Sequence, residues 1–294
     1  GTIAIGDVAN AGTLKWTGSS NESTDRVIDL VGTTGGATID ASGSGVLTLS
    51  SAITATGVGA KSLTLTGTGG TAGTPNVISS GISAGVSAVI SLIKTGTGVW
   101  RLDAASSYTG TTTIQNGTLL LGSFSQDFSA LTLGGLSGGA ATLALGSSGT
   151  ATLTGALTFS AANNPSGATI SGSGTATLDL NAATRTFVVG SSSSANGADL
   201  TISAVIADAL TGGALTKTGN GTLVLTGANT YVGTTSVDGG TLIVSPQAIV
   251  NSLTINVGTN GTAGALNFYA DGAVADVNLA SNANLNIGGA SAAG

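Results

Sequence analysis

One stretch of thirty residues occurs twice in this sequence, and it constrains the fold more than any other feature. Residues 92–121 align with residues 215–244 without a gap, at an offset of 123 residues, and fourteen aligned positions are identical. A gapless match of this length indicates an internal repeat, which predicts a fold built from stacked copies of one unit. The identical pairs that mark the repeat are Lys94 and Lys217, Gly98 and Gly221, Tyr108 and Tyr231, Gly110 and Gly233, and Gly117 and Gly240.

Apolar residues alternate with threonine inside the repeat, which is the pattern of short strands with one buried face. Turns rich in glycine and asparagine separate these strands, because both residues tolerate the positive φ of tight corners. Short strands and short corners are typical of a β-solenoid or a β-sandwich, and the repeat favours the solenoid. The positions expected to face its lumen in the second copy are Leu223, Leu225, Val237, Leu242 and Val244.

A larger period surrounds the repeat. Similar phrases of strand, glycine-rich turn and strand begin at Ile3, Leu131 and Leu253. We therefore predict one continuous solenoid of about twelve to fourteen coils, built of supermodules of about 125 residues. The predicted division is a first supermodule at 1–130, a second at 131–252 and the start of a third at 253–294. The chain begins at Gly1 and shows no signal peptide, so we expect a slice of a longer repetitive protein.

The composition agrees with a narrow aliphatic lumen. The chain has 49 glycines and 3 prolines, 41% hydrophobic residues and only 3% aromatic residues. Such a chain cannot build a thick core around large rings, but it can fill a β-helix with stacked aliphatic side chains. Disorder is the competing interpretation of a sequence rich in glycine, serine and threonine. The continuous alternation of aliphatic residues and a net charge of only −6 argue against disorder.

The charged residues exclude several classes of function. With 7 Lys and Arg residues in all, the chain is not expected to bind nucleic acid or an anionic membrane surface. No apolar run is long enough for membrane insertion by this segment. Without His or Cys, and with scattered acids, we expect no enzyme, no metal site and no cofactor. The acids that look isolated in sequence are Asp40, Asp103, Asp179 and Asp238.

The second copy of the repeat reads LTKTGNGTLVLTGANTYVGTTSVDGGTLIV. This phrase closely resembles the autotransporter-associated β-strand repeat, also called the passenger-associated transport repeat. The first copy departs from the pattern at Trp100, at Asp103-Ala104 and at Ser106. The resemblance implies a right-handed parallel β-helix in the exported passenger of a bacterial protein, located outside the cell or on its surface. It also implies support of export and stalk formation rather than catalysis.

Three functions follow from this reading. The first is structural, a stiff stalk or the subunit of an extracellular fibre that associates with itself end to end. The second is an adhesin that binds glycans or surfaces through projecting loops at 21–30 and 122–129. Its candidate contact residues are Trp16, Trp100, Phe124 and Phe128. The third and weakest is ice binding by threonine arrays such as those at 64–66, 111–113 and 152–154, although threonine also suits exposed strand positions.

The sequence also predicts where the repeat lysines and tyrosines lie and which secondary structure residues 81–93 adopt. Lys94 and Lys217 precede a turn and are expected to lie outside the coil. Tyr108 and Tyr231 are expected to cover a corner of their coils. Residues 81–93 resemble a helix in composition, but their strict period-two alternation predicts strand.

Overall fold

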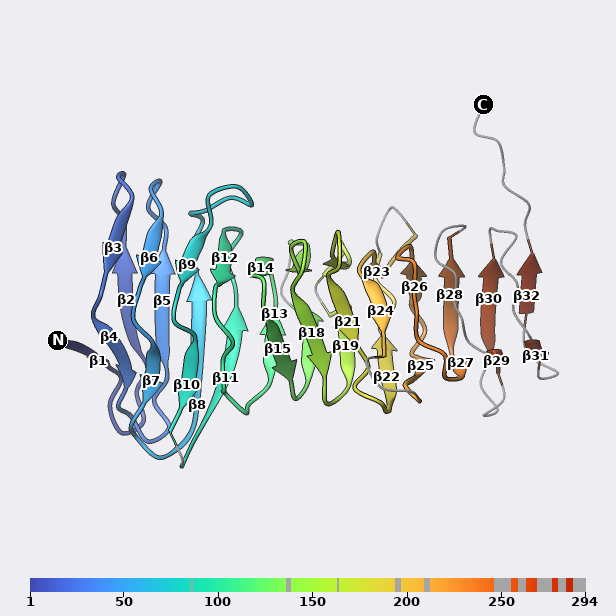
Figure 1. Ribbon diagram of the computed structural model, residues 1–294, viewed down its shortest axis with the longest axis horizontal. Helices are drawn as coiled ribbons and strands as arrows, with labels where there is room; N and C mark the ends of the chain where they lie inside the picture. The colour runs from blue at the N-terminus through green and yellow to red at the C-terminus, as the bar shows by residue number, and fades with distance from the viewer. Residues whose placement is uncertain are drawn as a thin grey trace.

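The computed structural model is an all-β solenoid whose coils stack along its long axis (Figure 1). The structure describes residues 1–85, 87–135, 139–162, 164–193, 197–208, 212–245, 255–258, 263–268, 277–279 and 284–287. Within these ranges the regular elements are strands, and each pairs in parallel with the strand of the next coil, as β2 does with β5 and β26 with β28. The prediction of a parallel β-solenoid is therefore confirmed, whereas its right-handed sense stays a prediction.

Two long sheets run through the whole described part of the chain, each with twelve strands, as a solenoid of about twelve coils requires. Long sheet 1 contains β2 Gly12–Trp16, β5 Ala37–Ala41, β8 Gly59–Thr66, β11 Ala88–Lys94, β13 Thr112–Ile114, β16 Leu131–Gly134, β19 Leu157–Ser160, β22 Thr184–Val189, β25 Ala214–Thr218, β27 Thr235–Val237, β29 Ile255–Val257 and β31 Val277–Leu279. Long sheet 2 contains β3 Glu22–Thr24, β6 Leu47–Leu49, β9 Asn76–Ile78, β12 Val99–Leu102, β14 Gly117–Leu121, β17 Ala141–Ala144, β20 Ala168–Ser171, β23 Leu200–Ile202, β26 Thr222–Leu225, β28 Gly240–Val244, β30 Gly264–Phe268 and β32 Asn284–Ile287.

The third face of the solenoid is discontinuous. Its first sheet contains β1 Thr2–Ile5, β4 Val27–Leu30, β7 Ile53–Ala55 and β10 Ile82–Ala84. Its second sheet contains β15 Ser125–Phe128, β18 Thr150–Leu153, β21 Thr177–Asp179 and β24 Val205–Ala207. Each sheet ends where a copy of the thirty-residue repeat crosses this face, because no strand forms between β12 and β13 or between β26 and β27. The repeat therefore marks a change in cross-section.

The pairing register measures that change. In long sheet 1, Lys94 pairs with Ile114 and Lys217 pairs with Val237, so the coil that closes each repeat takes 20 residues. Coils with a strand on all three faces are longer, such as the 30 residues between Val188 and Thr218. The step from β11 to β25, which carry the two lysines, is five strands along long sheet 1. One 123-residue period thus corresponds to five coils.

The lumen is filled by aliphatic side chains from alternate strand positions. The five lumen positions expected in the second repeat are all confirmed, since each is at most 3% exposed. The segment 81–93, which was predicted to be strand, is also resolved into strands. Residues 82–84 and 88–94 are strands, as expected, whereas residue 86 lies outside the described residues.

The two predicted projecting loops are wrong. The segment 21–30 contains β3 and β4, and Ile28 and Leu30 on β4 are fully buried. The segment 122–129 contains β15, which pairs with β18 and buries Phe128. Charged and polar residues made both segments resemble loops, but pairing with a neighbouring coil turns them into strands. No helix among the described residues is long and apolar enough to cross a membrane.

Candidate functional site

Lys94 and Lys217, here called the corner lysines, are the largest departure from the sequence-based expectation. Each is the lysine near the end of its strand in long sheet 1, and each is fully buried rather than outside the coil. The ammonium of Lys94 donates hydrogen bonds to the carbonyl oxygens of Thr95 at 2.6 Å, Gly96 at 2.8 Å and Asn116 at 3.0 Å. Two of these acceptors belong to its own corner, and the third belongs to the corner of the next coil.

The second repeat builds the same arrangement. The ammonium of Lys217 donates to the carbonyl oxygens of Thr218 at 3.3 Å, Gly219 at 3.0 Å and Gly239 at 2.8 Å. An ammonium has three donors and no acceptor, so three carbonyl oxygens satisfy it completely. A buried carbonyl without a donor is costly, and the lysine removes that cost on both sides of the junction. Each corner lysine therefore joins two successive coils.

The environment of the corner lysines shifts their titration toward neutral pH. Burial lowers the pKa of Lys94 to about 7. Burial also lowers the pKa of Lys217, to about 8, and the charge of Asp199 partly opposes this shift. Both corner lysines therefore have a pKa well below the ordinary value of a lysine.

The repeat tyrosines occupy the lumen where the third face lacks a strand. The hydroxyl of Tyr108 lies 2.7 Å from Oγ1 of Thr112, and that of Tyr231 lies 2.8 Å from Oγ1 of Thr235. Both threonines are fully buried, so each hydroxyl satisfies the other. Burial raises the pKa of both tyrosines above its ordinary value, while the threonine bond favours ionisation. These rings fill the space that a strand would otherwise cover.

Side chains also cap the edges of the interrupted third face. Ser106 Oγ accepts a hydrogen bond from the backbone N–H of Ile82 on β10, at 3.0 Å. At the same place in the second repeat, Asn229 Oδ1 accepts from the N–H of Ile206 on β24, at 2.8 Å. These acceptors replace the carbonyl that a next strand would have supplied. In the sequence, Ser106 stands out only as a departure from the repeat pattern.

The identical glycines of the repeat permit close contact between coils. Gly117 and Gly240 have φ angles of 69° and 61°, which glycine adopts without strain. A Cβ atom on the other repeat glycines would collide with a backbone carbonyl of a neighbouring coil. The glycines and the carbonyls concerned are Gly98 with Gly69, Gly221 with Gly190, Gly110 with Ile90 and Gly233 with Gly213.

The expected surface contacts are only partly available at the surface. Trp100 and Phe128 are 1% and 0% exposed, so the prediction that they contact a ligand at the surface is wrong. The indole N–H of Trp100 instead donates to the carbonyl of Thr66, at 3.0 Å. Trp16 and Phe124 are half-buried and pack against the core. Trp100 and Phe128 lie in the lumen because each occupies a strand position whose side chain points inward.

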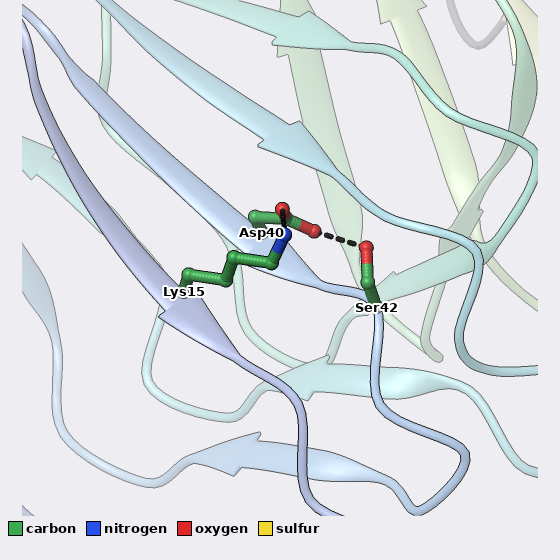
Figure 2. Close-up of polar contacts among 3 residues, drawn as sticks. All are labelled: Lys15, Asp40 and Ser42. Carbon is green, nitrogen blue, oxygen red and sulfur yellow. Dashed lines mark hydrogen bonds and ion pairs between the residues drawn. The ribbon is translucent and has the colours of Figure 1, made fainter.

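Two ion pairs link charged groups among the described residues, Lys15 with Asp40 and Arg101 with Asp103. Figure 2 shows Asp40 between Lys15, whose ammonium lies 3.5 Å from the carboxylate, and Ser42, whose hydroxyl donates to it. Lys15 is well exposed, so this pair contributes little. In the described part of the chain, no group of three or more His, Cys, Asp or Glu residues is placed to hold a metal ion.

Threonines line the outer surface of long sheet 1 in single file. Thr13, Thr38 and Thr64 are in register, as are Thr113, Thr132 and Thr158. Ile93 and Val188 interrupt the row. The position two residues further along holds Lys15 and Asp40 in the first two coils, so no regular double array forms there.

Comparison with known proteins identifies relatives of the repeat and of the chain. A family model described as the passenger-associated-transport-repeat matches residues 92–121 and 215–244, the two copies described above. The chain is 32% identical over 265 residues to a protein named adhesin BmaC autotransporter, of Brucella suis biovar 1 (strain 1330). That match covers 85% of this chain and 8% of the relative, so the chain spans a small part of the relative's length. No solved structure matches the chain.

Proposed function

We propose that this chain, an autotransporter passenger repeat protein with two passenger-associated-transport-repeats, is a stiff structural segment of a bacterial surface or secreted protein of the adhesin type. The observation that carries the proposal is the pair of twelve-strand parallel sheets, which extend through the described residues along one axis. A stalk needs such continuity, because a break in both sheets would create a flexible joint. Figure 1 shows the described strands arranged as one stack of coils.

The mechanical role follows from how the coils are held. Backbone hydrogen bonds run parallel to the solenoid axis, so they resist extension directly. The lumen packs aliphatic side chains along the whole rod, and each coil buries its neighbours' apolar surface. Where the third face loses a strand, a side-chain cap joins two neighbouring coils instead. At the corner between the two long sheets, a corner lysine also joins neighbouring coils. These bonds support the assignment of a load-bearing role to the repeats.

We assign no catalysis to this segment. Two of its buried charged groups bond within the fold, since Lys94 donates to three carbonyls and Asp29 accepts from Thr54 and Thr56. The matched relative is named an adhesin. Adhesion by the whole protein is therefore part of the proposal, with this segment as the support that carries a binding region.

Binding by the segment itself is the second candidate. Trp16 and Phe124 are half-buried, so they are the two predicted contact residues that remain candidates for contact with a glycan or a surface. End-to-end association into a fibre is the third candidate, since a parallel solenoid exposes unpaired strand edges at an open end.

Electron microscopy of the purified chain, over a range of concentrations, separates these candidates. A stalk segment is expected to give single rods about 60 Å long, from about twelve coils spaced about 4.8 Å apart. Filaments that lengthen with concentration would show that the segment is a fibre subunit rather than a stalk. Glycan binding that is lost in Trp16→Ala or Phe124→Ala, but kept in Val8→Ala, would make the segment itself the adhesive part.

A further inference from the structure

Asn116 places a side-chain amide at the corner that Lys94 closes. It lies between β13 and β14, and its backbone carbonyl is the acceptor that the next coil offers to Lys94, at 3.0 Å. The equivalent residue of the second repeat is Gly239, whose carbonyl receives Lys217 at 2.8 Å. The backbone carbonyl therefore has the same role in both repeats, whereas the first repeat adds an amide side chain at this position.

This amide is held against its own main chain. Asn116 Oδ1 accepts a hydrogen bond from the N–H of Gly117 at 2.7 Å, and the same N–H donates to the carbonyl of Ala140 at 3.1 Å. The amide also lies against Gly139 of the next coil, where a Cβ atom would collide with Oδ1. Because the carbon Cγ is one covalent bond from Oδ1, it lies close to the nitrogen of the peptide that follows Asn116.

Cγ and that nitrogen are the atoms that join when asparagine loses ammonia. The Gly117 nitrogen gives its proton to a base in solution and bonds to Cγ, while Nδ2 takes up a proton and leaves as ammonia. A molecule of water then opens the cyclic succinimide at either carbonyl carbon, which gives aspartate or isoaspartate. Atoms held together in this way react more readily than free ones, and a glycine after the asparagine presents no Cβ atom to the ring.

The chain contains its own comparison for this site. The sequence Asn-Gly-Thr at 116–118 recurs at 220–222, in the corner between β25 and β26. There the N–H of Gly221 donates to the carbonyl of Val189, at 2.9 Å, rather than to its own asparagine. The two described sites therefore have the same local sequence but differ in where the side-chain amide lies.

We propose that Asn116 is a site of spontaneous deamidation, and that its isoaspartate product loosens the junction that Lys94 closes. In isoaspartate the main chain runs through Cβ and Cγ, so one extra backbone atom precedes β14. The pairing of Gly117 with Ala141 then cannot hold its register at the start of that strand. The rod thus contains a joint that ages chemically, which goes beyond its role as a stalk.

The aspartate product has a different effect, because it leaves the main chain unchanged. Its carboxylate can still accept the N–H of Gly117, and its backbone carbonyl can still accept Lys94. Asn116→Asp reproduces this product directly. The variant therefore separates the effect of an added charge from the effect of an added backbone atom.

Mass spectrometry of the chain kept in mildly alkaline buffer tests the proposal, because it measures ammonia loss and isoaspartate at each asparagine. In the folded chain we expect Asn116 to react at least about tenfold faster than Asn220. In urea the two rates should become similar, because only the local sequence then matters. Asn116→Gly copies the second repeat and should abolish the product at this corner without changing the rate at Asn220. Equal rates in the folded chain, or a faster Asn220, would overturn the proposal.

Hydrogen exchange tests the consequence for the junction. In the aged chain that carries isoaspartate, protection of the Thr118 amide, which donates to the carbonyl of Gly98, is expected to fall by at least about tenfold. The equivalent amide of Thr241 should keep its protection, and so should Thr118 in Asn116→Asp. An aged chain with full protection at Thr118, or an equal loss in Asn116→Asp, would contradict the proposed effect of the extra backbone atom.

Discussion

The corner lysines show how one residue can satisfy a junction that backbone pairing leaves open. A strand position sends the aliphatic stem of Lys217 through the lumen, where it packs as a leucine would. Its ammonium then meets three carbonyl oxygens of two corners. Lys15 offers a useful contrast, because it lies on the outside of β2 and meets a single carboxylate.

Replacement of the buried lysine is expected to cost much more than replacement of the exposed one. Lys217→Met keeps the stem but leaves three carbonyls without a donor, so we expect a loss of about 2–4 kcal/mol. Lys15→Met should cost about 0–1 kcal/mol. Chemical denaturation of both variants beside the parent chain measures the difference. Equal midpoints for the two variants would show that the corner bonds do not stabilise the fold.

The corner lysines also predict how stability depends on pH. The unfolded chain binds more protons than the folded chain between pH 7 and 10.5, so the free energy of unfolding is expected to rise with pH in that window. The double variant Lys94→Met/Lys217→Met should lose most of this rise. Measurements should stop near pH 9.5, because ionisation of unfolded tyrosine then begins to oppose the effect. A slope that survives in the double variant would assign it to other groups.

The buried tyrosine hydroxyl gives a prediction about one hydrogen bond. Tyr231→Phe leaves the fully buried Thr235 hydroxyl without its partner, so we expect a loss of about 1–2 kcal/mol. Thr235→Val combined with Tyr231→Phe should recover part of that loss, since both polar atoms are then absent. A double-mutant cycle in denaturant measures the coupling, and additive losses would argue against the bond.

At the scale of elements, the repeat ends one sheet of the third face and lets another begin. Asn229 and Ser106 provide the acceptor that a missing strand cannot. The cap is expected to tolerate exchange between the two repeats: Asn229→Ser should keep most of the stability, whereas Asn229→Ala should lose about 1–2 kcal/mol. Thermal denaturation compares the two variants. A serine variant as unstable as the alanine variant would mean that packing, rather than the cap, matters.

The corner glycines can be tested against a glycine that meets no such constraint. Gly240 has positive φ, and a Cβ atom there would meet the carbonyl oxygens of Gly221 and Gly219. Gly240→Ala is therefore expected to destabilise the chain by about 2 kcal/mol or more. Gly73 has open space around its Cα, so Gly73→Ala should change little. Similar denaturation midpoints for both variants would contradict the account of close coil contacts.

Much of the element pattern could be predicted from the sequence because local alternation survives in the fold. Leu223, Leu225 and Val237 face the lumen as their spacing indicates. Burial of Lys217 could not be predicted, because the carbonyls that receive its ammonium are set by the next coil. For the same reason, Asp127 and its neighbours on β15 looked like a loop until β18 paired with them. Contacts between coils therefore determine features that the local sequence periodicity does not, such as the burial of Lys217 and the pairing of β15.

At the scale of the whole molecule, the 123-residue period corresponds to five coils of one solenoid. Long sheet 1 passes from β11 to β25 through β13, β16, β19 and β22 without a break. The 20-residue coils of the repeats and the longer coils between them share this sheet. The period is therefore a unit of length along the rod, even though the coils inside it differ in size.

Duplication of one period tests this central claim most directly. In a chain with residues 94–216 present twice in tandem, Lys94 follows residue 216 in the position that Lys217 normally takes. The account predicts that small-angle X-ray scattering will show a rod longer by about 24 Å, which is five coils at about 4.8 Å, with an unchanged cross-section. A thicker particle, or one with a second compact body beside the rod, would contradict it.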